Sequence, residues 1–457
     1  MQESIYICLS KNSFVRCTKK LAYIANQCTG KQLIYDSEEW LKVLTHTPQE
    51  MEDVISQLTH YYENVDINEL TKDFIEFIEL LTNEGFIITG KTPIEIEKKN
   101  NEEIQFHMDI PLITDLTLEV TNRCNERCIH CYLPNSLKDK GSYMSLEKIK
   151  SLVDEFVELG GRTVTLTGGE VLLYQDIFNL LLYIHQKQLG IIIYSNLIAL
   201  TEKHLTDLKK LNVRIIQVSL YGVNPDIHDS ITGVKGSCVR TKQSIERLLE
   251  THIPLKIVCP VMKDNSKDIV NVLEFAKWHK IPIELELNIT ARENQDRDNL
   301  EHRLTISEME VLLRELVEYD KEYTTNLLYR HKYIYDENFP FAEYLNYPVC
   351  TAGHYGLYIT ADGKVSTCPN LQGMEMGHVN NSSLKNIWNH NPVIDKIRRI
   401  TESSFQKCIN CDACDYCFRC FARNYTETGN PMEIPEYACE MAFLAKKIIE
   451  EQNLKSN

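Results

Sequence analysis

The stretch Glu119-Val-Thr-Asn-Arg-Cys-Asn-Glu-Arg-Cys-Ile-His-Cys-Tyr132 places Cys124, Cys128 and Cys131 in a Cys-x3-Cys-x2-Cys spacing. It directly follows an apolar run that predicts a buried strand. Three thiolates on one short loop can bind three irons of a four-iron cluster and leave the fourth iron open. That open iron can chelate amino and carboxylate groups. From the spacing alone, a zinc site with His130 as the fourth ligand is the alternative.

The sequence around this stretch alternates between apolar strand-like runs and helical patterns. The six runs are Leu116–Val120, Thr163–Leu166, Ile191–Tyr194, Ile215–Leu220, Leu255–Pro260 and Ile283–Leu287. Between the first two, Ser145–Leu159 has the pattern of a capped amphipathic helix that ends at Gly160. Six such units predict an α/β fold, a parallel sheet closed or half-closed as a barrel. Its chemistry should gather at the carboxyl ends of the strands.

The cysteine spacing resembles the signature of the radical S-adenosylmethionine (SAM) superfamily, and the resemblance extends over residues 113 to about 290. The strand after the cysteine loop ends in Thr167-Gly168-Gly169-Glu170, similar to the Gly-Gly-Glu sequence that grips the SAM amino group in that family. Val171 departs from the proline that often follows. The resemblance implies a partial (β/α)6 TIM-like barrel that cleaves SAM to a 5′-deoxyadenosyl radical. It also assigns SAM contacts to His130, Gly168, Gly169, Glu170, Ser195, Asn196 and Ser219.

A second cysteine tract lies near the C-terminus, at Cys350, Cys368, Cys408, Cys411, Cys414, Cys417, Cys420 and Cys439. Cys350 and Cys368 flank an expected hairpin of Leu357–Thr360 and Val365–Thr367. Such density in a reducing compartment indicates metal ligands before disulfides, and a pair of zinc sites is the alternative. The region from 350 to 439 is poor in apolar residues and continuous helix, so metal clusters are expected to stabilise it.

The tract resembles the SPASM extension of radical SAM peptide-modifying enzymes, which binds two auxiliary 4Fe–4S clusters. By resemblance, Cys408, Cys411, Cys417 and Cys439 bind the outer cluster, and Cys350, Cys368 and Cys420 bind the inner one. The interval from Cys417 to Cys420 is one residue shorter than is usual, and Cys414 is an additional candidate ligand. Either Cys414 completes the inner set, or an inner iron stays open and can bind a substrate thiolate.

Residues 1–88 have three strand-like runs followed by three helical patterns, which predicts a small α+β domain. The order resembles the winged-helix-like recognition domain of enzymes that mature ribosomally made peptides, which binds a leader peptide as an added strand. We expect that edge at Leu21–Ala25, against the helix Ile67–Leu81. The expected organisation is completed by a linker over 89–112, the barrel over 113–320, a bridging region over 321–349 and the cysteine-rich domain over 350–457.

Composition limits the function classes further. The net charge of −16 argues against a nucleic-acid partner, because phosphate binding needs clustered basic residues. No apolar run approaches the roughly 20 residues that span a bilayer, and Met1–Ser10 does not read as a secretory signal. A cytoplasmic protein is expected.

Together these features predict a maturase of the sactipeptide or ranthipeptide type, which forms a thioether between a peptide cysteine and a carbon atom. Its expected partners are a leader-bearing precursor peptide and an electron donor such as flavodoxin or ferredoxin. The alternatives are carbon–carbon crosslinking, formylglycine formation, epimerisation with Cys259 as thiol donor, and a non-enzymatic zinc or iron–sulfur module. Arg292, Asp296 and Asp298 follow the sixth strand, a position suited to substrate contacts, and an exposed charged loop is the favoured interpretation.

Overall fold

The computed structural model describes residues 4–454 except 18–21, 28, 36–37, 63–64, 95–112, 135, 137–140, 212, 330–345 and 372. Most of the expected linker and the middle of the bridging region therefore lie outside the described residues. Among the described residues, no helix combines the length and hydrophobicity that a bilayer-spanning segment needs.

The central element is an eight-stranded sheet with the order β12-β11-β10-β9-β8-β7-β13-β14. Its first six strands in chain order are parallel and confirm the six predicted runs. They are β7 (Asp115–Thr121), β8 (Thr163–Gly168), β9 (Gly190–Ser195), β10 (Val213–Ser219), β11 (Leu255–Pro260) and β12 (Ile283–Glu286). The sheet is the half-closed α/β barrel that the alternation predicted.

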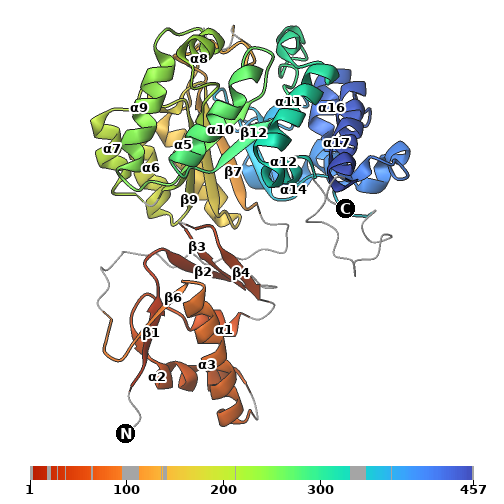
Figure 1. Ribbon diagram of the computed structural model, residues 1–457. Helices are drawn as coiled ribbons and strands as arrows, with labels where there is room; N and C mark the ends of the chain where they lie inside the picture. The colour runs from red at the N-terminus through yellow and green to blue at the C-terminus, as the bar shows by residue number, and fades with distance from the viewer. Residues whose placement is uncertain are drawn as a thin grey trace.

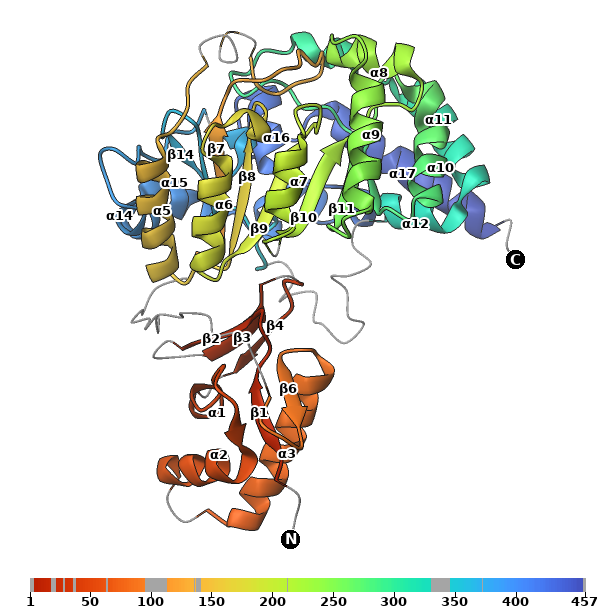
Figure 2. The same cartoon turned by 90° about the vertical axis from the view of Figure 1, so that its left-hand side faces the viewer.

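Helices α5, α6, α7 and α9 line the outer face of this sheet (Figure 2). The helix α5 forms as expected, because the Ser145 side chain accepts a hydrogen bond from the Lys148 backbone N–H and Gly160 has a φ of +87°. The barrel helices are α5 (Leu146–Glu158), α6 (Ile177–Gln186), α7 (Glu202–Leu208), α8 (Pro225–Thr232), α9 (Ser237–Leu249), α10 (Ile269–Trp278), α11 (Ile306–Tyr319) and α12 (Lys321–Leu328).

The C-terminal region joins the barrel through the predicted hairpin, β13 (Gly356–Ile359) and β14 (Val365–Ser366). The sequence did not predict that β13 pairs in parallel with β7 and so extends the barrel sheet. The remaining helices continue the layer of barrel helices: α14 packs against α5, and α17 packs against α11 and α12 (Figures 1 and 2). They are α14 (Leu384–His390), α15 (Pro392–Arg398), α16 (Phe421–Thr428) and α17 (Glu436–Leu454).

The expectation that this region lacks helix and apolar burial is wrong. Trp388 of α14 is fully buried, and Ile394 and Ile397 of α15 are buried in the same hydrophobic core as the barrel strands. The barrel and the C-terminal region therefore share one core and do not depend on metal alone for packing.

The N-terminal part contains two three-stranded antiparallel sheets, ordered β5-β1-β6 and β2-β3-β4, and has a core of its own. Its elements are β1 (Tyr6–Leu9), β2 (Ser13–Cys17), β3 (Ala22–Asn26), β4 (Gln32–Tyr35), α1 (Glu39–Lys42), β5 (Gln49–Glu50), α2 (Met51–Leu58), α3 (Ile67–Asn83) and β6 (Ile87–Gly90). The sheet β2-β3-β4 faces the barrel (Figure 1). Because β4 pairs with β3, the expected free edge at Leu21–Ala25 is wrong: β3 is the central strand.

Candidate active site

A cavity of about 380 Å³ opens at the carboxyl ends of the barrel strands. All three loop cysteines, Cys124, Cys128 and Cys131, line it, as do His130, Gly168, Gly169, Ser195, Asn196 and Ser219. Glu170 is the one residue among the expected SAM contacts that does not line the cavity. The strand ends thus bring nine of the ten residues of the predicted centre around one space.

The cysteine loop is held by contacts around Cys128. Its thiol lies 3.4 Å from Glu126 Oε2 and 3.6 Å from the Tyr221 hydroxyl, and the Cys131 backbone N–H donates to the Cys128 carbonyl at 3.2 Å. The Tyr221 ring packs edge-on against His130, with ring centroids 4.9 Å apart. The sequence analysis did not single out Tyr221, although it lies two residues after the predicted Ser219 at the end of β10.

A buried arginine braces the same loop from the other side. Arg292 is only 8% exposed, and its Nη1 donates to the Cys131 carbonyl at 2.5 Å and to the Leu133 carbonyl at 3.5 Å. Its Nε and Nη2 bind Asp298 at 2.5 and 3.1 Å. The Asn299 amide adds a bond to the His130 carbonyl at 3.2 Å. The expected exposed charged loop is therefore wrong for Arg292.

Gly168 and Gly169 allow the end of β8 to touch the cysteine loop. Gly168 has a φ of +148°, and a Cβ atom there would lie 2.1 Å from the Thr121 carbonyl oxygen; at Gly169 it would lie 2.2 Å from the Arg123 carbonyl oxygen. The Gly169 and Glu170 N–H groups donate to these two carbonyls at 2.7 and 2.8 Å. Side chains would push the loop away, so both glycines are needed to position the cysteines.

The buried Glu170 does not line the cavity, and its carboxylate binds groups of the protein. It accepts from the Ser195 hydroxyl at 2.7 Å and from the backbone N–H groups of Leu172 and Asn196 at 2.9 and 2.8 Å. Burial raises the pKa of this carboxyl, against the effect of its hydrogen bonds. Glu170 therefore orients Ser195 and Asn196, which line the cavity, and its contact with the SAM amino group stays a prediction.

Another buried carboxylate links the barrel to the C-terminal region. Glu119 of β7 accepts hydrogen bonds from the hydroxyls of Tyr132 and Tyr358, and the two hydroxyls lie 3.2 Å apart. Tyr132 also lines the cavity, and Tyr358 belongs to β13. Burial raises the pKa of Glu119. This network ties the cysteine loop to β13, the strand that lies between Cys350 and Cys368 in the chain.

The C-terminal cysteines separate into two neighbourhoods. Burial is the largest cause that raises the pKa values of Cys350 and Cys368, and the pKa of Cys368 rises to about 12. The nearby Cys420 thiol also raises both pKa values. In the other neighbourhood, Cys408, Cys414 and Cys439 likewise raise the pKa of Cys417, and Cys411 raises that of Cys408. Cys414 thus lies with the outer set, which has five thiols, while the inner set has three. This grouping favours an open inner position over recruitment of Cys414, and the assignment of the ligands stays a prediction.

The inner set lies beside the cavity. Asn370, two residues after Cys368, and Arg423, three residues after Cys420, both line it. Cys259 is different: it is fully buried in the barrel core and is not a lining residue, and burial raises the pKa of its thiol. The geometry does not support Cys259 as a hydrogen donor to a bound peptide.

These residues fit an iron–sulfur cluster and SAM. Three thiols face one cavity whose wall is bare backbone at two glycines, with hydroxyl and amide groups opposite, and such groups can bind a cluster, an amino acid and a ribose. Among the described residues, no three His, Cys, Asp or Glu side chains surround a single metal-ion position.

Comparison with known proteins agrees with this geometry. Residues 118–276 match the radical SAM superfamily, and residues 350–420 match the SPASM iron–sulfur cluster-binding domain. The chain is therefore a radical SAM enzyme with a SPASM extension, and its cofactors are SAM and 4Fe–4S clusters. The zinc alternatives are set aside.

Three relatives show the range of proteins that share these features. An AdoMet-dependent heme synthase of Methanosarcina barkeri is 25% identical over 334 residues, 70% of this chain and 94% of that protein. The antilisterial bacteriocin subtilosin biosynthesis protein AlbA of Bacillus subtilis is 32% identical over 162 residues, 35% of this chain and 36% of AlbA. The fold of Streptococcus suis SuiB, bound to its precursor peptide SuiA, matches 95% of this chain and 99% of SuiB, with a TM-score of 0.64 and 16% identity.

Proposed function

We propose that this enzyme modifies a ribosomally made precursor peptide and forms a thioether between a peptide cysteine and a carbon atom. The observation that carries the proposal is the inner set of Cys350, Cys368 and Cys420 beside the cavity. Its three thiols leave one position of a four-iron cluster without a cysteine. Bacteriocin biosynthesis by the relative AlbA and peptide binding by SuiB support a peptide substrate.

When bound, SAM and its cluster supply a 5′-deoxyadenosyl radical that removes a hydrogen atom from carbon. Cys124, Cys128 and Cys131 would hold the cluster, and Ser195, Asn196 and Ser219 would contact SAM. Arg292 fixes the carbonyls of the cysteine loop, and Tyr132 and Tyr221 close the cavity wall. The chain thus contributes orientation and exclusion of water.

In the overall reaction, the peptide loses two hydrogens, one from carbon and one from the thiol. The carbon loses a hydrogen atom to the 5′-deoxyadenosyl group, the thiol loses a proton, and one electron leaves as the carbon–sulfur bond forms. An electron carrier such as flavodoxin or ferredoxin would supply the electron for SAM cleavage and accept the one released. A thiol ionises readily on iron, so an open inner position would present the sulfur as thiolate.

The N-terminal domain is proposed to bind the leader as an added strand on β4. The Asn26 N–H donates to the Lys31 carbonyl at 2.9 Å. By the alternation of antiparallel pairs, the backbone groups of Gln32 and Ile34 then point to the free edge. Tyr35 of β4 packs edge-on against Phe77 of α3, with ring centroids 5.3 Å apart, so this edge adjoins the predicted helix.

The test is to incubate reduced, cluster-loaded enzyme with SAM and a cysteine-bearing precursor. We expect a product that has lost two hydrogens, resists thiol alkylation and shows a thioether by tandem mass spectrometry. Retained mass with a free thiol would contradict the proposal. A two-hydrogen loss with the thiol still alkylated would indicate carbon–carbon crosslinking instead.

A second candidate is favoured by the heme synthase relative, which this chain matches over most of that protein. The same incubation with an iron porphyrin in place of the peptide distinguishes the two. Consumption of the porphyrin without any change in the peptide would favour tetrapyrrole chemistry. Cys259 offers no support for epimerisation, because it lies outside the cavity.

A further inference from the structure

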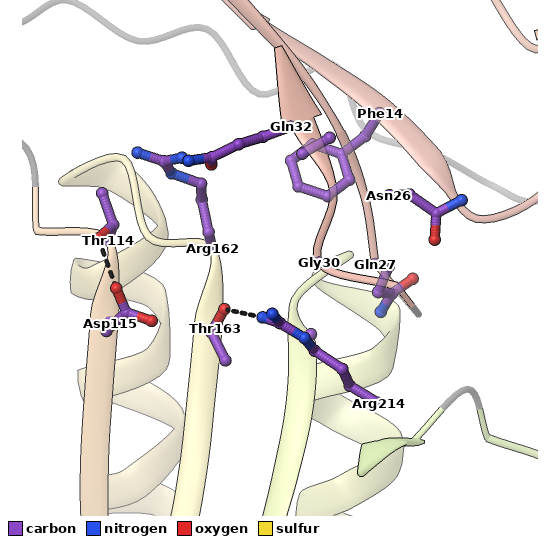
Figure 3. A pocket seen from close by; sticks show the side chains of 12 residues that line it. Phe14, Asn26, Gln27, Gly30, Gln32, Thr114, Asp115, Arg162, Thr163 and Arg214 are labelled. Carbon is purple, nitrogen blue, oxygen red and sulfur yellow. Dashed lines mark hydrogen bonds between the residues drawn. The ribbon is translucent and has the colours of Figure 1, made fainter. Parts of the chain in front are cut away.

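The seam between the N-terminal domain and the barrel contains a second cavity, of about 210 Å³, far from the cysteine loop (Figure 3). Its lining comes from the sheet β2-β3-β4 and from the amino ends of the barrel strands, including Gln32, Asp115, Arg162, Thr163 and Arg214. The opposite ends of the same strands line the active-site cavity. The seam cavity therefore takes no part in the chemistry proposed above.

Two guanidinium groups face this cavity with few partners. Arg162 stacks over the Tyr23 ring, with its Cζ 4.7 Å from the centroid, and its buried Nε has no hydrogen-bond partner among the described residues. Within the part of the chain that the structure describes, Arg214 donates to the Thr163 hydroxyl at 3.4 Å. Asp115 is the acidic lining residue, and it accepts from the Thr114 hydroxyl at 2.6 Å. Stacking uses the face of a guanidinium and leaves its edge free to bind a carboxylate.

The sheet register connects this cavity to the free edge of β4. Phe14 pairs with Ala25 and Ala25 pairs with Gln32, so the three side chains share the face of the sheet toward the barrel. Gln32 and Arg162 line the same cavity, one from the sheet and the other from the barrel (Figure 3). In a leader strand added to β4, the residue opposite Gln32 would continue the row of side chains formed by Phe14, Ala25 and Gln32. Its side chain would then lie over Arg162.

The neighbouring row of paired side chains defines a second position in the added leader strand. Tyr23 pairs with Ile34, and Ile34 is 54% exposed on the same face of β4. A residue opposite Ile34 lies two positions from the residue opposite Gln32, because alternate residues of a strand face the same side. Burial of the exposed isoleucine favours an apolar residue there.

We propose that Arg162 and the seam cavity bind the carboxylate of an aspartate or glutamate in the leader peptide, two residues from an apolar side chain that covers Ile34. The inference rests on the proposed addition of the leader to β4. It assigns part of leader recognition to the barrel, so that the leader contacts both domains at once.

The test starts from random peptides displayed against the full-length, cluster-loaded enzyme. Enriched peptides should share an acidic and an apolar residue two positions apart. Affinity is then measured by fluorescence anisotropy for each acidic peptide and for its amide variant. The protein variants are Arg162→Gln, Ile34→Pro and Lys31→Gln; the last removes one charge from an exposed residue of the same domain that pairs with Glu84 at 2.8 Å. Thermal unfolding checks that each variant folds.

We expect Arg162→Gln to weaken binding of the acidic peptide about tenfold and to leave the amide peptide unchanged. Lys31→Gln should affect neither, and Ile34→Pro should weaken both by removing an N–H from the free edge. If Ile34→Pro weakens binding but Arg162→Gln does not, or if Arg162→Gln weakens both peptides equally, the inference is wrong and strand addition stands. If Ile34→Pro has no effect, strand addition itself fails and the inference fails with it.

Discussion

Glu170 illustrates how a single buried side chain positions a site that it does not enter. In Glu170→Gln, one carboxylate oxygen is replaced by an N–H₂ group that cannot accept from Ser195 or from the backbone. We expect SAM to bind about tenfold more weakly and the free energy of unfolding to fall by about 1–3 kcal/mol. Calorimetric titration with SAM and thermal unfolding measure the two effects.

The matched control is Glu202→Gln, because the Glu202 side chain is 84% exposed and pairs with Arg247 at the surface. It should change neither quantity measurably. Equal loss of SAM affinity in both variants would contradict the role assigned to Glu170.

The contacts of Arg292 lead to a different prediction, which concerns the iron content of the cysteine loop rather than the binding of SAM. In Arg292→Lys, the charge remains but one ammonium cannot bind Asp298 in a bidentate manner and also reach two carbonyls. We expect less iron in the cluster of the cysteine loop and an altered electron paramagnetic resonance signal for that cluster. The signals of the auxiliary clusters should stay unchanged. A wild-type spectrum with full iron would show that the brace is dispensable.

Glu293 makes the stability of the folded protein depend on pH. Burial, followed by the nearby Glu119 carboxylate, raises the pKa of its carboxyl to about 8. The folded protein therefore holds a proton that the unfolded chain releases above about pH 4.5, so stability falls as the pH rises from there through 8. In Glu293→Gln this decrease should be smaller. Thermal unfolding between pH 5 and 9 tests it, and identical slopes in the two proteins would refute it.

At the scale of elements, β8 and the cysteine loop depend on a contact that admits no side chain. Gly168→Ala would place a Cβ 2.1 Å from the Thr121 carbonyl oxygen, and Gly429→Ala, also at a positive φ, meets nothing within 4 Å. We expect Gly429→Ala to cost about 1 kcal/mol of stability and to load iron normally. Gly168→Ala should lose stability by several times that amount and bind little iron at the cysteine loop. Iron analysis and thermal unfolding compare the pair.

The barrel elements were predictable because apolar strand-like runs alternate regularly with amphipathic helical patterns, and this signal holds even for β12, of whose four residues one is buried. The strand β4 was missed because Gln32–Tyr35 is short and two of its four side chains are exposed. That omission also placed the leader edge on the wrong strand. Arg292 was misjudged because its partners are carbonyls of a loop about 160 residues away, which no local pattern reveals. The grouping of Cys414 likewise depends on tertiary packing, not on spacing.

At the scale of the whole molecule, the two cysteine neighbourhoods differ in whether they have a spare ligand. Loading all three clusters requires about 12 irons per chain. Cys414→Ser should keep close to this number, because four other thiols remain in the outer set. Cys420→Ser should lose about four irons, because the inner set has no replacement. Iron and sulfide analysis of the purified proteins decides it, and a loss of about four irons in Cys414→Ser would overturn the grouping.

The pairing of β13 with β7 also governs how the protein can be made. The Thr114 and Tyr355 backbone groups that begin this pairing lie 241 residues apart in the chain. On the ribosome, the edge of β7 stays open until β13 has been synthesised, and an open edge invites pairing with other chains. We expect expression at low temperature to raise the yield of active enzyme, because the hydrophobic contacts that accompany such pairing weaken on cooling.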